Sequence, residues 1–138
     1  MKKSKILFVI IFTLLVIGLT AGCTRGDAAS SWPGISLENG AGYFTYGSQI
    51  YAIDAGNGNL IWRYPQDSNN SLQFYAPPEI SDEMVFVGSY ANSFVGLDKQ
   101  SGFLEWEFKA AGDRFVGSAL SVDGAVFAPN ADGYLYAL

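Results

Sequence analysis

The segment “YAIDAGNGNLIW”, residues 51–62, decides the fold, because a second segment, “VGLDKQSGFLEW”, residues 95–106, repeats its pattern. Both segments place a small residue, an Asp, a Gly and a Trp at the spacing small-x-Asp-x-x-x-Gly-x-x-x-Trp, and they start 44 residues apart. The stretch “YLYAL”, residues 134–138, matches the opening of a third copy. A period of this length predicts one supersecondary unit that is built repeatedly along the chain. The motif residues are Ala52, Asp54, Gly58 and Trp62, then Gly96, Asp98, Gly102 and Trp106.

Each motif position has a physical role in a strand, turn and strand unit. The Asp ends one strand and can accept hydrogen bonds from the backbone N–H groups of the turn that follows. Asn57-Gly58 and Ser101-Gly102 are hairpin dipeptides in which Gly supplies the positive φ that closes the turn. The Trp on the next strand is large enough to reach a neighbouring sheet, and the small residue leaves room for such a ring. We therefore expect the eight motif residues to dock one sheet onto the next.

The rest of the chain reads as short apolar runs broken by Gly, Asn, Asp, Ser or Pro, with no sustained helical period. This pattern predicts an all-β protein. A repeat of about forty residues with four antiparallel strands is typical of a β-propeller blade. Runs that are apolar at consecutive positions, such as residues 84–87 and 49–53, indicate sheets that are buried on both faces. The expected strands are residues 34–37, 43–46, 49–54, 60–64, 78–81, 84–88, 93–98, 104–109, 118–122, 125–129 and 134–138.

The repeated motif resembles the pyrroloquinoline quinone (PQQ) enzyme repeat, Ala-x-Asp-x-x-Thr-Gly-x-x-x-Trp, which builds eight-bladed propellers. Asn57 and Ser101 stand where that family has Thr, and Gly96 replaces one Ala. Such repeats occur in BamB-type lipoproteins of the outer-membrane β-barrel assembly machinery and in PQQ-dependent dehydrogenases. The dehydrogenases hold the quinone on the propeller axis with a vicinal cysteine pair, whereas this chain has a single cysteine. The resemblance implies a propeller in which no residue of this stretch is assigned to PQQ.

The N-terminus has the features of a secretory leader, since “MKKSK” is followed by a short apolar run at residues 6–19. The run ends in “LTAGC”, residues 19–23, which resembles the lipobox of bacterial lipoproteins, with Thr20 standing where Leu is usual. That resemblance implies cleavage after Gly22 and acylation of Cys23, which would anchor the mature protein in a membrane. An ordinary signal peptide and an uncleaved N-terminal anchor are the alternatives.

These signals predict the organisation of the whole chain. Two blades and part of a third cannot close a ring, so we expect the chain to be the N-terminal part of a longer propeller. The expected segments are a lipoprotein signal peptide at 1–22, the lipidated Cys23 and a flexible tether at 23–33, a first blade at 34–75, a second blade at 76–116 and an incomplete third blade at 117–138.

Charge and composition narrow the class of function. Losing Lys2, Lys3 and Lys5 with the leader would take the formal net charge from −5 to −8, which argues against nucleic acid as a partner. The chain has no His, which removes Ser-His-Asp and Cys-His catalysis. Without His, and with the one cysteine assigned to the lipid, a zinc site is not expected either. We expect no catalytic residue, metal ligand or cofactor-binding residue in this stretch.

Three weaker chemical interpretations remain open. Glu105 and Glu107 lie two residues apart on an expected outer strand. They are either a catalytic carboxylate pair or charges that discourage strand pairing. Residues 54–59 place oxygen ligands at alternate positions like the start of a calcium loop, but Pro65 occupies the position where such a loop needs Glu. Several aromatic residues are candidates for a glycan-binding face or for core packing between sheets, namely Phe74, Tyr75, Phe86, Tyr90, Phe94, Phe103, Phe115 and Phe127.

Two hypotheses about function follow. The first is a lipid-anchored, extracytoplasmic binding or scaffold module that contacts other envelope proteins, at the cell membrane or at the periplasmic face of an outer membrane. The second is the front portion of a PQQ-dependent dehydrogenase or another envelope enzyme, in which further blades supply the active site.

Overall fold

The computed structural model describes residues 34–138, and these residues form eleven strands and no helix. The leader, Cys23 and the tether lie outside the described residues. Within residues 34–138 there is accordingly no helix of the length and apolarity needed to span a membrane. The strands are β1 (Ile35–Glu38), β2 (Ala41–Tyr46), β3 (Gln49–Asp54), β4 (Leu60–Tyr64), β5 (Glu79–Ile80), β6 (Met84–Gly88), β7 (Phe94–Asp98), β8 (Leu104–Phe108), β9 (Leu120–Val122), β10 (Ala125–Pro129) and β11 (Leu135–Ala137).

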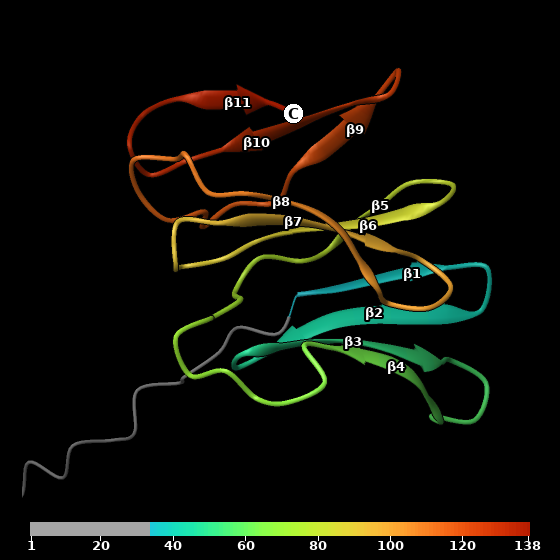
Figure 1. Cartoon of the computed structure of the whole chain (residues 1–138). Helices are drawn as coiled ribbons and strands as arrows, with labels where there is room; N and C mark the ends of the chain where they lie inside the picture. Colours follow the sequence, from blue (N-terminus) through green and yellow to red (C-terminus); the bar gives the residue numbers. More distant parts are fainter. Residues whose placement is uncertain (1–33) are drawn as a thin grey trace, which may run out of the picture.

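The strands form three antiparallel sheets, and each sheet is an up-and-down meander in chain order. The first sheet is β1-β2-β3-β4, the middle sheet is β5-β6-β7-β8 and the third sheet is β9-β10-β11. The three sheets lie one above the other in sequence order (Figure 1). Short hairpins join neighbouring strands, as in the blades of a propeller. The prediction of an all-β chain with four-stranded antiparallel sheets is confirmed.

The middle sheet is buried on both faces because it has a neighbour on each side. Its strands β6 and β7 contain runs of four consecutive buried residues. Alternate side chains of one strand point to opposite faces, so Val85 and Val87 join the core shared with the first sheet while Phe86 joins the core shared with the third. The outer strand β4 of the first sheet is instead mostly exposed, with Trp62 buried between exposed neighbours. Double-sided burial therefore holds for the inner strands of the middle sheet. The expectation was wrong for residues 49–53 in β3, where half-buried and buried residues alternate.

Two apolar cores hold the three sheets together. The core between the first and middle sheets is larger and includes Ile50, Trp62, Phe74 and Leu97. Phe94, Phe115 and Val126 are among the buried residues of the core between the middle and third sheets. Removing apolar surface from water is worth about 25 cal/mol per Å², so these two layers supply the main stabilisation of a chain that has a single cysteine.

The first two sheets match in detail. Each has a register shift in its last strand pair at the same point, between Ala52 and Ile53 in one and between Gly96 and Leu97 in the other. Most expected strands agree with the structure to within one or two residues. The expected strand at 78–81 is reduced to Glu79–Ile80, because Pro78 has no N–H to donate and the backbone N–H of Ser81 donates to Met84 O in the turn. The expected strand at 43–46 starts earlier, at Ala41, which pairs with both Glu38 and Asp54.

Candidate functional site: the junctions between sheets

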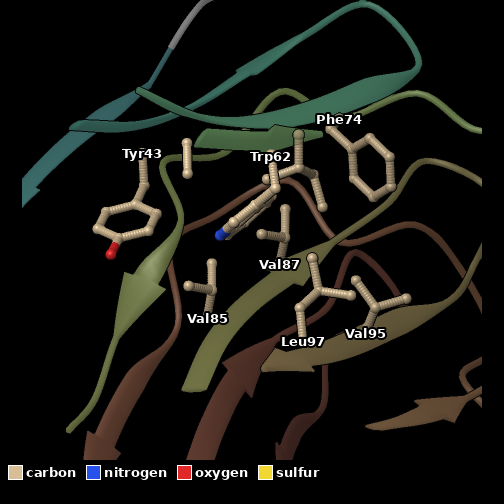
Figure 2. Packing of buried hydrophobic residues seen from close by; sticks show 9 residues of the cluster. Tyr43, Trp62, Phe74, Val85, Val87, Val95 and Leu97 are labelled. Atoms are coloured by element: carbon tan, nitrogen blue, oxygen red, sulfur yellow. The ribbon is translucent and has the colours of Figure 1, made fainter. Parts of the chain in front are cut away.

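Trp62 lies at the centre of the junction between the first and middle sheets. The indole is 5% exposed and lies among Tyr43, Val85 and Val87 (Figure 2). Its Nε1–H donates a hydrogen bond of 2.8 Å to the backbone oxygen of Lys99 in the middle sheet. The Trp62 side chain thus fills the apolar core with its ring and joins the two sheets with a hydrogen bond.

Gly102 forms the surface that the Trp62 ring packs on. A Cβ atom placed on Gly102 would lie 2.5 Å from Cδ2 of Trp62, which is closer than real atoms approach. The residue also has φ of +70°, in the left-handed region that favours glycine. Gly58, the corresponding residue of the first sheet, has φ of +76° but no neighbour within 4 Å of such a Cβ. The glycine of this motif therefore serves the turn in both copies and the packing of an indole in one.

The small motif residues leave space beside the two indoles. Ala52 pairs with Trp62 and is fully buried, and Gly96 pairs with Trp106. A Cβ on Gly96 would lie 2.5 Å from Cε2 of Trp106, so the second position excludes even alanine without movement of the ring. In the third sheet Ala137 lies on β11, and it pairs with Phe127.

The two aspartates cap the turns that the glycines close. Asp54 Oδ1 accepts a hydrogen bond of 2.7 Å from the N–H of Gly56, and Asp98 Oδ1 accepts one of 2.7 Å from the N–H of Ser101. The side-chain hydroxyl of Ser101 also donates to Asp98, and these bonds hold the pKa of the Asp98 carboxyl below its usual value. The backbone bonds of the two turns are the same, since the N–H of Gly58 donates to Asp54 O and that of Gly102 to Asp98 O, both at 2.8 Å.

Lys99 adds an ion pair to the first junction. Its Nζ lies 2.7 Å from Glu38 Oε2 in the first sheet and donates a 2.8 Å hydrogen bond to Ser81 O in the middle sheet. The Lys99 side chain is only 15% exposed, so this pair is screened less than a surface pair. Sequence reasoning missed this link, because Ala55 takes the corresponding place in the first motif and the partner Glu38 lies 61 residues away.

Trp106 has a different environment from Trp62. Its ring packs against Phe86 and Phe94, with ring centroids 5.9 and 6.1 Å apart. Trp106 also lines an open hollow of about 570 Å³, together with Val126 and Leu138 of the third sheet. Within residues 34–138, no hydrogen bond corresponds to the one between Trp62 and Lys99. The structure thus holds one filled junction and one open junction.

The residues behind the weaker chemical interpretations are placed as follows. Glu105 is exposed, and Glu107 pairs with Lys109 at 2.8 Å. The Asp54 carboxylate is occupied by backbone N–H groups of its own turn, and residues 34–138 contain no group of three metal-ligating side chains.

The aromatic candidates divide between core and surface. Four of them are buried in the two cores, namely Phe74, Phe86, Phe94 and Phe115. Phe103 is 70% exposed and Phe127 36%. Tyr75 and Tyr90 form a tilted pair with centroids 4.2 Å apart, and the Arg114 guanidinium lies over the Tyr90 ring.

Comparison with known proteins agrees with the repeated four-stranded sheets described above. A family model described as outer membrane protein assembly factor BamB matches residues 28–138. Among solved structures, BamB from Moraxella catarrhalis superimposes with a TM-score of 0.64 at 26% identity, over 83% of this chain and 34% of that one. A quinohemoprotein alcohol dehydrogenase from Pseudomonas putida HK5 gives a TM-score of 0.63 at 22% identity, over 80% of this chain and 19% of the enzyme, which is a likeness of fold.

One curated relative is described as a dehydrogenase. The Paracoccus denitrificans protein described as “Putative dehydrogenase XoxF” is 30% identical over 82 residues, which is 54% of this chain and 14% of that protein. This chain therefore spans about a seventh of the dehydrogenase and about a third of the Moraxella BamB.

Proposed function

Because the chain belongs to the family described as outer membrane protein assembly factor BamB, we propose that it is a non-catalytic β-propeller module that binds other proteins of the cell envelope. The observation that carries the proposal is that motif residues form contacts between sheets. Trp62 and Gly102, both within the matched residues 28–138, are in contact between sheets. The Trp62 ring and the Gly102 turn are therefore engaged in packing, which leaves loops and strand edges as the surfaces for a partner.

A membrane anchor is the second part of the proposal. The lipobox-like residues 19–23 place Cys23 at the start of the mature chain, and the polar stretch that follows would keep the sheets at a distance from the lipid. The acidic balance of the chain disfavours electrostatic docking on anionic lipid, so the acyl chains would provide the attachment. The module would then face the extracytoplasmic side of a bacterial membrane.

Acyl labelling of the whole chain tests the anchor. The chain is produced in a bacterium that is fed an alkyne analogue of palmitate, and the purified protein is probed by click chemistry. We expect label on the wild-type chain in the membrane fraction and none on Cys23→Ser, which keeps the same leader. Equal labelling of both chains, or a wild-type chain found free of the membrane, would contradict the anchor.

The resemblance to “Putative dehydrogenase XoxF” supports a second candidate, the front portion of a PQQ-dependent enzyme. The two candidates differ in a direct measurement. The enzyme candidate has its active site in further blades, so the measurement uses the product of the extended reading frame: added PQQ and Ca²⁺ should leave the quinone absorbance unchanged and give no alcohol-dependent dye reduction if the protein is a binding module. Saturable quinone binding would favour the enzyme, while crosslinking in cells to other envelope proteins, without PQQ binding, would favour the module.

A further inference from the structure

The connections between strands gather at two opposite ends of the stack of sheets (Figure 1). One end, which we call the far end, holds the turns at residues 39–40, 55–59, 81–83, 99–103 and 123–124. The other end, which we call the tether end, holds the turns at residues 47–48, 89–93 and 130–134 and the longer connections at 65–78 and 109–119. Gly34 also lies at the tether end, since it directly precedes β1 and its carbonyl accepts a hydrogen bond of 3.4 Å from the N–H of Thr45. The expected tether therefore joins the sheets at the end that these loops form.

The two ends differ in charge. In its turns and the strand residues beside them, the far end has one basic residue, Lys99, and six acidic residues, namely Glu38, Asp54, Asp82, Glu83, Asp98 and Asp123. The tether end has two basic residues, Lys109 and Arg114, and four acidic residues, namely Asp67, Glu79, Asp113 and Asp132. Anionic lipid attracts basic side chains and repels acidic ones. A bilayer surface is therefore better tolerated at the tether end than at the far end.

Exposed tyrosines are a second feature of the tether end. Each sheet presents one, namely Tyr46 at the end of β2, Tyr90 in the turn at 89–93 and Tyr134 in the turn at 130–134. The far-end turns, all within residues 34–138, contain no tyrosine. A tyrosine combines an apolar ring with a polar hydroxyl and is enriched where lipid headgroups meet hydrocarbon. The tether end thus has the side chains that suit the headgroup layer of a bilayer.

Arg114 is positioned by one of these tyrosines. Its Cζ lies 5.2 Å from the centroid of the Tyr90 ring, and the Tyr75 ring lies 4.2 Å from the same ring. Backbone hydrogen bonds hold the loops together, since the N–H of Tyr90 donates to Gln73 O at 2.8 Å and the N–H of Ala131 donates to Arg114 O at 3.0 Å. Neither ion pair of residues 34–138 includes Arg114. Its guanidinium is therefore available to a lipid phosphate, which Arg binds with two parallel hydrogen bonds.

The length of the expected tether brings this end close to the lipid. Ten residues, 24–33, separate Cys23 from Gly34. Fully extended they would span at most about 35 Å, and a flexible chain of ten residues has a root-mean-square span of about 17 Å. The far end lies a strand length further away, about 20 Å for the six residues of β2. An acylated Cys23 would therefore let the tether end reach the bilayer before the far end does.

From these observations we propose that the tether end rests on the surface of the lipid bilayer. Tyr46 and Tyr90 would enter the headgroup layer, Arg114 would bind lipid phosphate, and the acidic far end would point away from the membrane toward other envelope proteins. The inference rests on the Cys23 anchor of the proposed function and adds an orientation that the anchor alone does not impose.

The test uses the full-length acylated chain in vesicles of phosphatidylethanolamine and phosphatidylglycerol that contain a nitroxide-labelled phosphatidylcholine. Since the chain has one cysteine, which acylation would block, a second cysteine can be labelled selectively with the fluorophore NBD. Ala91→Cys places the label in an exposed turn of the tether end, and Ala55→Cys is the matched position in an exposed turn of the far end. We expect the nitroxide lipid to quench the label at position 91 and to leave the label at position 55 unchanged.

Substitutions at the two ends then identify the side chains that make the contact. In the Ala91→Cys chain, Arg114→Gln should lower the ratio of docked to undocked protein, read from the quenched fraction, by about fivefold. Tyr46→Ser should also reduce quenching. Phe103→Ser removes an exposed aromatic residue of the far end and should have no effect. Each variant is first compared with the parent chain by far-UV circular dichroism, so that loss of fold is not taken for loss of contact.

Acyl labelling of Cys23 separates this inference from the anchor on which it rests. A chain with neither acyl label nor quenching would overturn both. A labelled chain with no quenching at position 91, or with equal quenching at positions 91 and 55, would overturn the orientation alone. A change in NBD fluorescence at position 91 that follows protein concentration and needs no nitroxide lipid would also overturn it, since a second copy would then be the occupant.

Discussion

Alanine substitution at two glycines with nearly the same backbone angle would measure the energy of the first junction. Gly102 and Gly58 have φ of +70° and +76°, so alanine is strained at both, by about 1–2 kcal/mol. Only at Gly102 would the new Cβ meet a neighbour, 2.5 Å from Cδ2 of Trp62. Overpacking of a well-filled core costs about 1–3 kcal/mol in addition. We therefore expect Gly102→Ala to lower the free energy of unfolding by about 2–5 kcal/mol and Gly58→Ala by about 1–2 kcal/mol.

The assay is urea unfolding of the full-length chain in detergent, followed by far-UV circular dichroism. A double-mutant cycle with Trp62→Leu then assigns the difference to the ring. In the Trp62→Leu background the two alanine substitutions should cost the same to within about 0.5 kcal/mol, because the clash has been removed. The reasoning is refuted if Gly58→Ala and Gly102→Ala are equally destabilising in the wild-type chain, or if their difference persists when the indole is absent.

Three further predictions concern the Lys99–Glu38 ion pair, Gly96 and the turn that Asp98 caps. Glu38→Gln should lower the free energy of unfolding by about 1 kcal/mol and make it less sensitive to added NaCl, since Lys99 loses its ion-pair partner; an unchanged salt dependence in chemical denaturation would show that the pair contributes nothing. Gly96→Ala should cost about 1–3 kcal/mol because its Cβ would lie 2.5 Å from Cε2 of Trp106, and Trp106→Leu should rescue it in thermal unfolding, a result that additive costs would contradict. The pKa of Asp98 is lowered in the folded state by the hydrogen bonds from the Ser101 side chain and backbone, so its contribution is complete above the unfolded value of 3.8 and is lost as pH falls through the lower folded value. Ser101→Ala should therefore lose less stability than the wild type during acid titration below about pH 4, and parallel curves for the two chains would exclude this role.

Much of the fold could be predicted from the sequence because the repeat contains residues with strong local preferences for turns and strands. The dipeptides Asn57-Gly58 and Ser101-Gly102 mark turns, and both glycines have the positive φ that such turns need. The apolar run at residues 84–87 correctly indicated a strand covered on both faces, because only a sheet between two others can bury both sides.

The parts that could not be predicted depend on contacts between distant residues. Nothing near Lys99 in the sequence points to Glu38, because an ion pair between two sheets leaves no local pattern. The same applies to the different surroundings of Trp62 and Trp106, which have the same motif and differ in what lies opposite them. The exposure of Leu60 and Ile61 in β4 has no local signal either, because it depends on which sheets lie beside that strand. Lipidation of Cys23 and the segment boundaries stay predictions.

The way the junction is divided between sheets has a consequence for how such a protein can evolve. The middle sheet carries both halves of the joint, a glycine turn that receives the indole of the sheet before it and an indole that faces the sheet after it. A tandem duplication of one repeat therefore copies both halves of the joint together, a glycine turn for the preceding indole and an indole for the following sheet.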